Sequence, residues 1–123
     1  MLLVDTNVWL AAADRRSDHH EVCTRLLHDR RGELAVPVPV IAETSWLILD
    51  RLGPAAHRDF FQLLVAGSLV AVDLDAGDWQ RCVELIGRYA DLRLDLMDAS
   101  IVAIAERTAT TTIATFNYRD FQV

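Results

Sequence analysis

The chain has 123 residues, of which 52% are hydrophobic and 24% are charged, and its net charge is −6. This length suits one domain with its own hydrophobic core, so we expect a single domain over residues 1–123. The composition excludes a disordered chain, a collagen-like fibre and a disulfide-rich scaffold. The apolar runs are shorter than the roughly 20 residues of a membrane-spanning helix. The excess of acidic residues argues against binding nucleic acid by bulk charge attraction.

The N-terminal residues and the cysteines of the chain favour an intracellular location. The first residues have neither the positive start nor the small-residue cleavage site of a secretory signal. Cys23 and Cys82 are the only cysteines, and in an intracellular chain two such thiols are more often free and buried than bridged. We therefore expect a cytoplasmic protein.

The first half of the chain alternates short apolar runs with longer amphipathic ones. Residues 2–4 predict a buried strand that ends at Asp5. Residues 18–30 predict a helix with Asp18 as its N-cap and Gly32 as its stop. The apolar face of that helix is expected to consist of Val22, Leu26 and Leu27.

Three further elements are expected before residue 70. Residues 34–36 predict a second strand. Pro39 suits the first turn of a helix that runs to about Arg51 and ends at Gly53 and Pro54. Residues 55–66 predict another helix.

The second half of the chain continues the same alternation. Strands are predicted over 68–72 and 111–114, with a further short one near 121–123. Residues 76–90 predict an amphipathic helix, and an apolar helix opens at Asp98. The residues of 76–90 that share helical spacing are Trp79, Val83, Ile86 and Tyr89.

Strands that alternate with helices predict an α/β fold. We expect a three-layer domain in which a short, mostly parallel sheet of four to five strands is flanked by helices on both faces. Ligands of such folds bind beyond the carboxyl ends of the strands.

Three acidic residues stand in apolar surroundings. Asp5 follows a strand of Leu and Val, Glu43 lies within an apolar helix, and Asp98 separates two apolar runs. An unpaired buried carboxylate costs several kcal/mol, and the chain has no Lys to compensate it. A divalent metal ion is the economical partner, because Mg²⁺ and Mn²⁺ prefer carboxylates and water.

Each of these acids also has an ordinary structural interpretation. Asp5 after a strand and Asp98 at a helix start are both natural N-caps. Glu43 cannot cap from the middle of a helix, but it could occupy a partly exposed edge. Three independent coincidences are less plausible than one shared site.

Four segments of the chain resemble the PIN-domain nucleases, and among them the VapC-type toxins of bacterial toxin–antitoxin pairs. The segments are LLVDTNVWL at 2–10, VIAETSWLI at 40–48, LDLMDASIVAIAER at 94–107 and TTIATFNYRDF at 111–121. Each segment alone is a weak signal, but all four occur in the order and spacing of the family.

The resemblance implies a PIN-like fold and a Mg²⁺- or Mn²⁺-dependent endoribonuclease that hydrolyses RNA phosphodiester bonds. It assigns the catalytic and metal-binding roles to Asp5, Glu43 and Asp98. Asn117 stands where the family often has a fourth acid, which puts a second tightly held metal in doubt. Asp120, and more weakly Asp95, are the acids that could replace it.

The same chemistry suggests supporting residues. In-line hydrolysis needs an activated water and neutralisation of the phosphoryl charge. A metal held by Asp5 and Asp98 would act as the Lewis acid, and Glu43 would complete its ligands or orient the water. Thr6 and Thr115 could hydrogen-bond the carboxylates.

The resemblance also implies partners. Toxins of this family commonly form homodimers, and they bind an antitoxin whose C-terminal segment covers the active-site groove. The expected partners are therefore an RNA substrate, a cognate antitoxin and a second copy of the chain.

Other residues and functions fit less well. His19 and His20 make no zinc spacing with Cys23, and Trp9 and Trp46 suit a core or an interface better than base stacking. Arg15 and Arg16 follow the first helix, either near the rim of the site or in a solvated turn. A serine hydrolase is not expected, because Ser45 and Ser100 have no suitably placed histidine in the sequence.

Two alternative functions remain. A metal-dependent phosphatase with a strand-end aspartate nucleophile lacks a second aspartate two positions after Asp5. A PIN-like module that binds RNA or protein with weak catalysis is kept open by Asn117.

Overall fold

A single parallel sheet organises the residues that the computed structural model describes, 1–116. Its strands lie in the order β3-β2-β1-β4, so β1 is central and pairs with both β2 and β4. The strands are β1 (Leu2–Val4), β2 (Leu34–Pro37), β3 (Val70–Val72) and β4 (Ile113–Ala114). The predicted parallel sheet is confirmed, whereas the further strand predicted near 121–123 lies outside the described residues.

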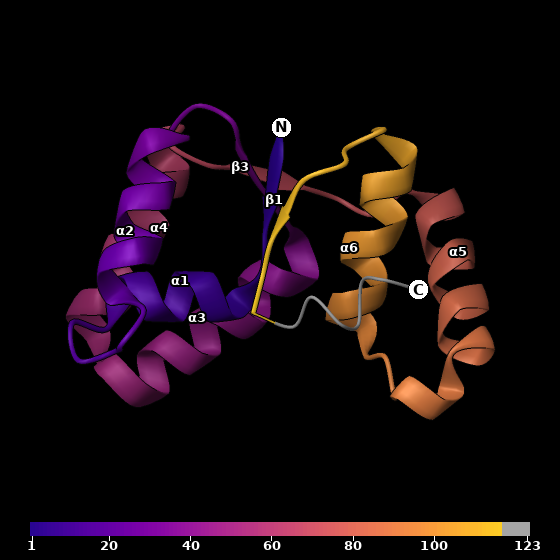
Figure 1. The fold of residues 1–123 in the computed structure, drawn as a ribbon, viewed down its shortest axis with the longest axis horizontal. Coiled ribbons are helices and arrows are strands. Elements are labelled where there is room, and N and C mark those ends of the chain that lie inside the picture. Colours follow the sequence, from indigo (N-terminus) through magenta and orange to yellow (C-terminus); the bar gives the residue numbers. More distant parts are fainter. Residues whose placement is uncertain (117–123) are drawn as a thin grey trace.

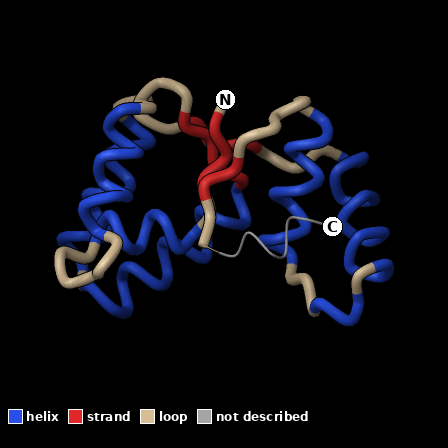
Figure 2. Tube along the Cα trace, in the orientation of Figure 1, coloured by secondary structure: helices blue, strands red, loops and turns tan. Residues whose placement is uncertain are grey.

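Helices cover both faces of this sheet, as the three-layer prediction requires. Figure 1 shows α1–α4 on one side of the strands and α5 and α6 on the other, and Figure 2 shows the strands between the two groups. The helices are α1 (Thr6–Ala13), α2 (His20–Asp29), α3 (Val38–Leu52), α4 (Pro54–Val65), α5 (Ala76–Arg88) and α6 (Leu96–Arg107), with a 3₁₀ turn η1 (Ala90–Leu92). Within the described part of the chain, no helix is both long and apolar enough to cross a membrane.

Proline and glycine set the limits of α3. Pro39 lies in its first turn, where a missing N–H costs nothing, and the helix ends at Gly53, whose φ is +92°. Pro54 then starts α4. The predicted limits of both helices are confirmed to within a few residues.

The prediction for α2 was partly wrong. The helix begins at His20 and its N-cap, His19, makes no side-chain capping bond, so Asp18 does not cap it. Val22 is 65% exposed, and Cys23 is the buried residue instead. Cys23, Leu26 and Leu27 lie at positions i, i+3 and i+4 and so share one face of the helix. Val22 precedes Cys23 by one residue and lies beside that face, where it is exposed.

The large apolar residues that share helical spacing in α5 do not form its buried face. Trp79, Val83 and Ile86 are exposed, whereas the buried residues are Asp78, Cys82 and Leu85. Both sets have the same i, i+4, i+7 spacing and are offset by one residue. Asp78 can belong to this buried set because its carboxylate accepts a hydrogen bond from Arg107, which lies on another helix.

Candidate active site

Asp5 lies at the carboxyl end of the central strand and caps the helix that follows. It is 4% exposed, and its Oδ1 accepts a hydrogen bond from the Thr6 N–H at 2.7 Å. Its Oδ2 accepts a hydrogen bond from the Thr115 hydroxyl at 2.8 Å. The capping interpretation of Asp5 is confirmed. Capping does not preclude metal binding, since a carboxylate has about four lone-pair sites.

Two threonines connect this carboxylate to neighbouring elements. Thr115 follows β4, so its bond to Asp5 joins the ends of two adjacent strands. Thr6 accepts a 3.4 Å hydrogen bond from the hydroxyl of Thr44, which is fully buried in α3. The pair brings α3 against the start of α1, one residue from Glu43. No local pattern in the sequence pointed to Thr44, because its partner is 38 residues away.

Asp98 lies inside the first turn of α6 and does not cap it. Asp95 is the N-cap, and its Oδ1 accepts the Asp98 N–H at 2.9 Å. The capping interpretation of Asp98 was therefore wrong. The signal was present in the sequence as an acid three residues before another at a helix start, a spacing typical of N-terminal caps.

Glu43 faces the start of α6. It lines a hollow of about 410 Å³ together with Pro39, Ala42, Asp95, Leu96 and Met97. Glu43 and Asp98 are each half-buried, so only Asp5 among the three acids is as buried as their sequence surroundings suggested. Glu43 thus occupies a partly exposed edge, which is its ordinary structural interpretation.

The start of α6 lies on the side of the molecule where β1 ends (Figure 1). The structure joins Asp5 to Thr115 and Thr6 to Thr44, and it places Glu43 opposite Asp95. Across residues 1–116, however, no group of three or more His, Cys, Asp or Glu side chains is arranged to hold a metal ion. Asn117 and Asp120, the other predicted members of the site, lie outside the described residues.

One histidine was misjudged from the sequence. The Oγ of Ser45 lies 2.8 Å from Nε2 of His57, so this serine does have a histidine partner. The pair is nevertheless poorly suited to hydrolysis, because Ser45 lies in the middle of α3, where the backbone N–H groups are bonded within the helix and form no oxyanion hole. A serine hydrolase is therefore excluded by the helical position of Ser45, although this serine does have a histidine partner.

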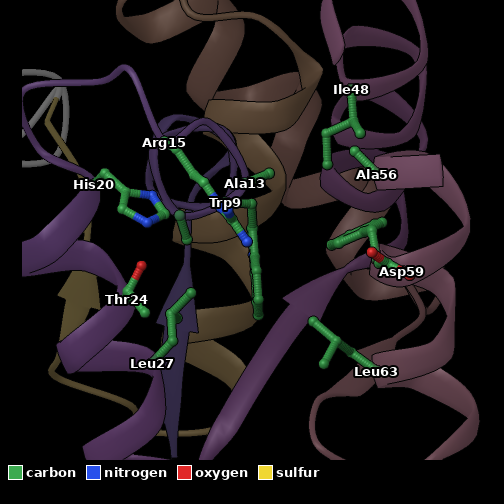
Figure 3. Close-up of a pocket in the computed structure, with 12 residues that line it drawn as sticks. Trp9, Ala13, Arg15, His20, Thr24, Leu27, Ile48, Ala56, Asp59 and Leu63 are labelled. Atoms are coloured by element: carbon green, nitrogen blue, oxygen red, sulfur yellow. The ribbon is translucent and has the colours of Figure 1, made fainter. Parts of the chain in front are cut away.

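A further cavity lies away from Asp5, Glu43 and Asp98. Figure 3 shows this space of about 420 Å³ between α1 and α2 on one side and α3 and α4 on the other. Trp9 lines it, is 3% exposed, and packs edge-on against Phe60 with ring centroids 5.5 Å apart. Trp9 Nε1 has no hydrogen-bond partner among the described residues. Trp46, by contrast, is 61% exposed and is not part of the core.

The family model of the PIN domain matches residues 2–123. The chain belongs to the PIN domain family. Its relative in Mycobacterium tuberculosis, Ribonuclease VapC26, is 27% identical over 98% of this chain and 89% of that protein.

Two solved structures share the fold of this PIN domain. The Mycobacterium tuberculosis toxin VapC20, described as cleaving the sarcin-ricin loop, superposes with a TM-score of 0.89 at 17% identity, over 99% of this chain and 94% of that one. A toxin–antitoxin complex from Klebsiella pneumoniae gives a TM-score of 0.74 at 20% identity, over 98% and 90% of the two chains. The PIN-like α/β fold expected from the sequence is thereby confirmed.

Proposed function

We propose that this PIN domain is a divalent-metal-dependent endoribonuclease and the toxin of a toxin–antitoxin pair. The observation that carries the proposal is the buried Asp5 carboxylate at the carboxyl end of the central strand, held by Thr6 and Thr115. The ribonuclease name of a relative that aligns with almost the whole chain supports the same activity.

The residues present fit a hydrated Mg²⁺ or Mn²⁺ ion. The donors are carboxylates, the ligands these ions prefer, and no ion pair among the described residues occupies Glu43. Mg²⁺ typically keeps several waters and takes one or two carboxylates plus substrate phosphates. The lack of a closed three-ligand group within residues 1–116 is compatible with that mode.

Asp5 and Asp98 would hold the ion, and Glu43 would complete its ligands or orient the attacking water. When bound, the ion supplies Lewis-acid stabilisation of the phosphoryl charge. Thr115 fixes one oxygen of Asp5 and the Thr6 N–H fixes the other, so the carboxylate does not have to reorganise during the reaction.

The activity is tested by mapping cleavage sites on total RNA with Mn²⁺. Asp98→Asn should abolish cleavage while the far-UV circular dichroism spectrum stays unchanged, because the variant keeps the size of the side chain and loses its charge. Asp91→Asn is the matched control, since Asp91 is an exposed acid in η1. Full activity of Asp98→Asn would contradict the site, and RNA binding without any cleavage by the wild type would favour a binding module.

Partners and location complete the proposal. The toxin–antitoxin neighbour supports an antitoxin as the partner of this chain, and we place it over the active-site groove. We further propose a homodimer in the cytoplasm. Sedimentation equilibrium of the purified chain tests the dimer, and a monomer at all concentrations would contradict it.

A further inference from the structure

A second hollow lies along α1, the helix that Asp5 caps. It has a volume of about 220 Å³, and its lining comes from α1, the turn after it, the end of α3 and the segment after β4. The side chains that matter here are Asn7, Asp14, Ser17, Arg51 and Phe116. Asn7 is two residues from Asp5, and Phe116 follows the Thr115 that donates to Asp5. Two lining residues of the hollow are therefore close in the chain to Asp5 and to its hydrogen-bond partner Thr115.

Phe116 offers an aromatic surface to this hollow. The residue is 42% exposed, and its ring lies against His19 with centroids 4.6 Å apart and planes tilted by 43°. An aromatic ring that stays accessible to solvent can stack with any base, and such stacking contributes about 1–3 kcal/mol per base.

The polar groups around the ring suit a base and its phosphate. The amide of Asn7 and the hydroxyl of Ser17 can both donate and accept hydrogen bonds, as the edges of bases require. Asp14 is already compensated, since its Oδ1 accepts the Arg16 N–H at 3.0 Å and lies 3.6 Å from the Arg16 Nε. Arg51 is exposed and takes part in no ion pair among the described residues. In a chain of net charge −6, a cation that forms no ion pair within residues 1–116 is a local attraction for phosphate.

We propose that this hollow binds one unstacked base of a single-stranded RNA, adjacent to the phosphodiester at Asp5, with the base stacked on Phe116 and Arg51 at its phosphate. This inference rests on the proposed ribonuclease activity and names the part of the substrate that the chain would read. Asn7 and Ser17 would then determine which base is preferred at that position.

The base site is tested without turnover. A single-stranded oligoribonucleotide carrying 2-aminopurine is titrated with wild-type protein in EDTA, and stacking on Phe116 should quench its fluorescence. Phe116→Leu should lose the quenching and bind about tenfold more weakly, as expected for one lost stacking contact.

Arg51→Gln should keep the quenching and show a shallower dependence of affinity on salt, because one phosphate contact is lost. Arg51 is exposed, so its replacement tests the site even if Phe116→Leu folds poorly.

The chain offers a matched control in Phe61. It is 36% exposed and also lies against a histidine, His57, at 5.1 Å between centroids, but it belongs to α4. Phe61→Leu should quench and bind like wild type. In the cleavage map with Mn²⁺, Phe116→Leu should broaden the base preference at one position next to the cleaved bond, while Phe61→Leu should not.

The outcomes separate the base site from the nuclease activity. If the wild type cleaves RNA but Phe116→Leu matches Phe61→Leu in quenching and in the map, the base site is overturned and the nuclease stands. If the wild type cleaves nothing but Phe116 still quenches the probe, the nuclease proposal fails and the base site survives as a binding site. Loss of antitoxin binding by Phe116→Leu with unchanged RNA binding would identify the hollow as a protein contact and overturn the inference.

Discussion

Asp5 combines two roles that one substitution can separate. Its cap needs only a side-chain oxygen, and Asn caps a helix about as well as Asp. A negative charge is therefore not required for the capping role. A carboxyl side chain at a nearly fully buried position, where Asn would cap equally well, is what a cation partner would explain.

Asp5→Asn in chelator should melt at or above the temperature of the wild type. The variant keeps the cap and relieves repulsion between the carboxylates that share the proposed site. Asp5→Ala is the comparison, and it should lose about 1–2 kcal/mol because the cap disappears. Differential scanning calorimetry in EDTA measures all three proteins, and a clear drop for Asp5→Asn would mean that its charge stabilises the fold itself.

Manganese provides the second half of this prediction. A ligand that binds only the native state stabilises it by about 2.7 kcal/mol at a hundredfold excess over its Kd. Added Mn²⁺ should therefore raise the melting temperature of the wild type more than that of Asp5→Asn. Equal rises in melting temperature for the two proteins would mean that Asp5 does not bind the metal ion.

At the scale of elements, a buried acid fastens α5 to α6. Asp78 is 3% exposed and belongs to a capping box with Asp75 at the start of α5. Both of its carboxylate oxygens accept hydrogen bonds from Nε of Arg107 in α6, at 2.9 and 3.1 Å. A second bridge between the same helices, Arg81 to Glu106 at 2.7 Å, is solvent-exposed. The two bridges differ mainly in the burial of the carboxylate, since the side chain of Asp78 is 4% exposed and that of Glu106 is 47% exposed.

Arg107→Met should destabilise the protein more than Arg81→Met. Removing Arg107 leaves a buried carboxylate without its cation, and we expect a loss of about 2–3 kcal/mol, below the usual range because the Arg107 side chain is 38% exposed. Arg81→Met should cost about 1 kcal/mol or less, as surface pairs do. Urea denaturation at pH 7 measures both, and equal losses would contradict the difference in burial.

The same pair of variants predicts a pH effect. The hydrogen bond from Arg81 lowers the pKa of Glu106 below its ordinary value of 4.5. Because the pKa is lower in the folded state, this stability is present above about pH 4.5 and is lost as the pH falls through the folded pKa. The difference in unfolding free energy between the wild type and Arg81→Met should therefore become smaller below pH 4.5. A difference that does not change with pH would contradict the pairing of Arg81 with Glu106.

Element types were predictable from the sequence because their signals are local. Pro39, Gly53 and the apolar run at 2–4 fix the ends of α3 and the position of β1 within a few residues. The buried faces of α2 and α5 were not predictable in the same way. Asp78 can be buried only because Arg107, 29 residues away, reaches it, and a helical-spacing pattern contains no information on such a partner.

The whole molecule decides how much of the site the sequence can reveal. Asp5, Glu43 and Asp98 stood out because acids are rare in apolar runs, and the position of Asp5 at a strand end placed it at the carboxyl edge of the sheet. The bonds from Thr115 to Asp5 and from Thr44 to Thr6 span 110 and 38 residues. They depend on strand order and helix packing, so the fold had to be known before these supports could be assigned.

The proposal of one domain over the chain predicts a single cooperative unfolding transition. Ile101 and Ile104 of α6 belong to the same core as Leu3 and Trp9, whereas α5 packs on α6 through a smaller cluster of Cys82, Ala99 and Ala103.

The chain carries one buried thiol in each helical layer, Cys23 in α2 and Cys82 in α5, and burial raises the pKa of both. Cys82→Ala leaves only the Cys23 thiol and Cys23→Ala leaves only the Cys82 thiol, and each thiol should react with a disulfide reagent only as the chain unfolds. For each variant, the urea concentration at half-maximal labelling should equal the unfolding midpoint measured by far-UV circular dichroism. Labelling of Cys82 well below that midpoint, with Cys23 still protected at its own, would mean that α5 detaches first and that the chain does not unfold as one unit.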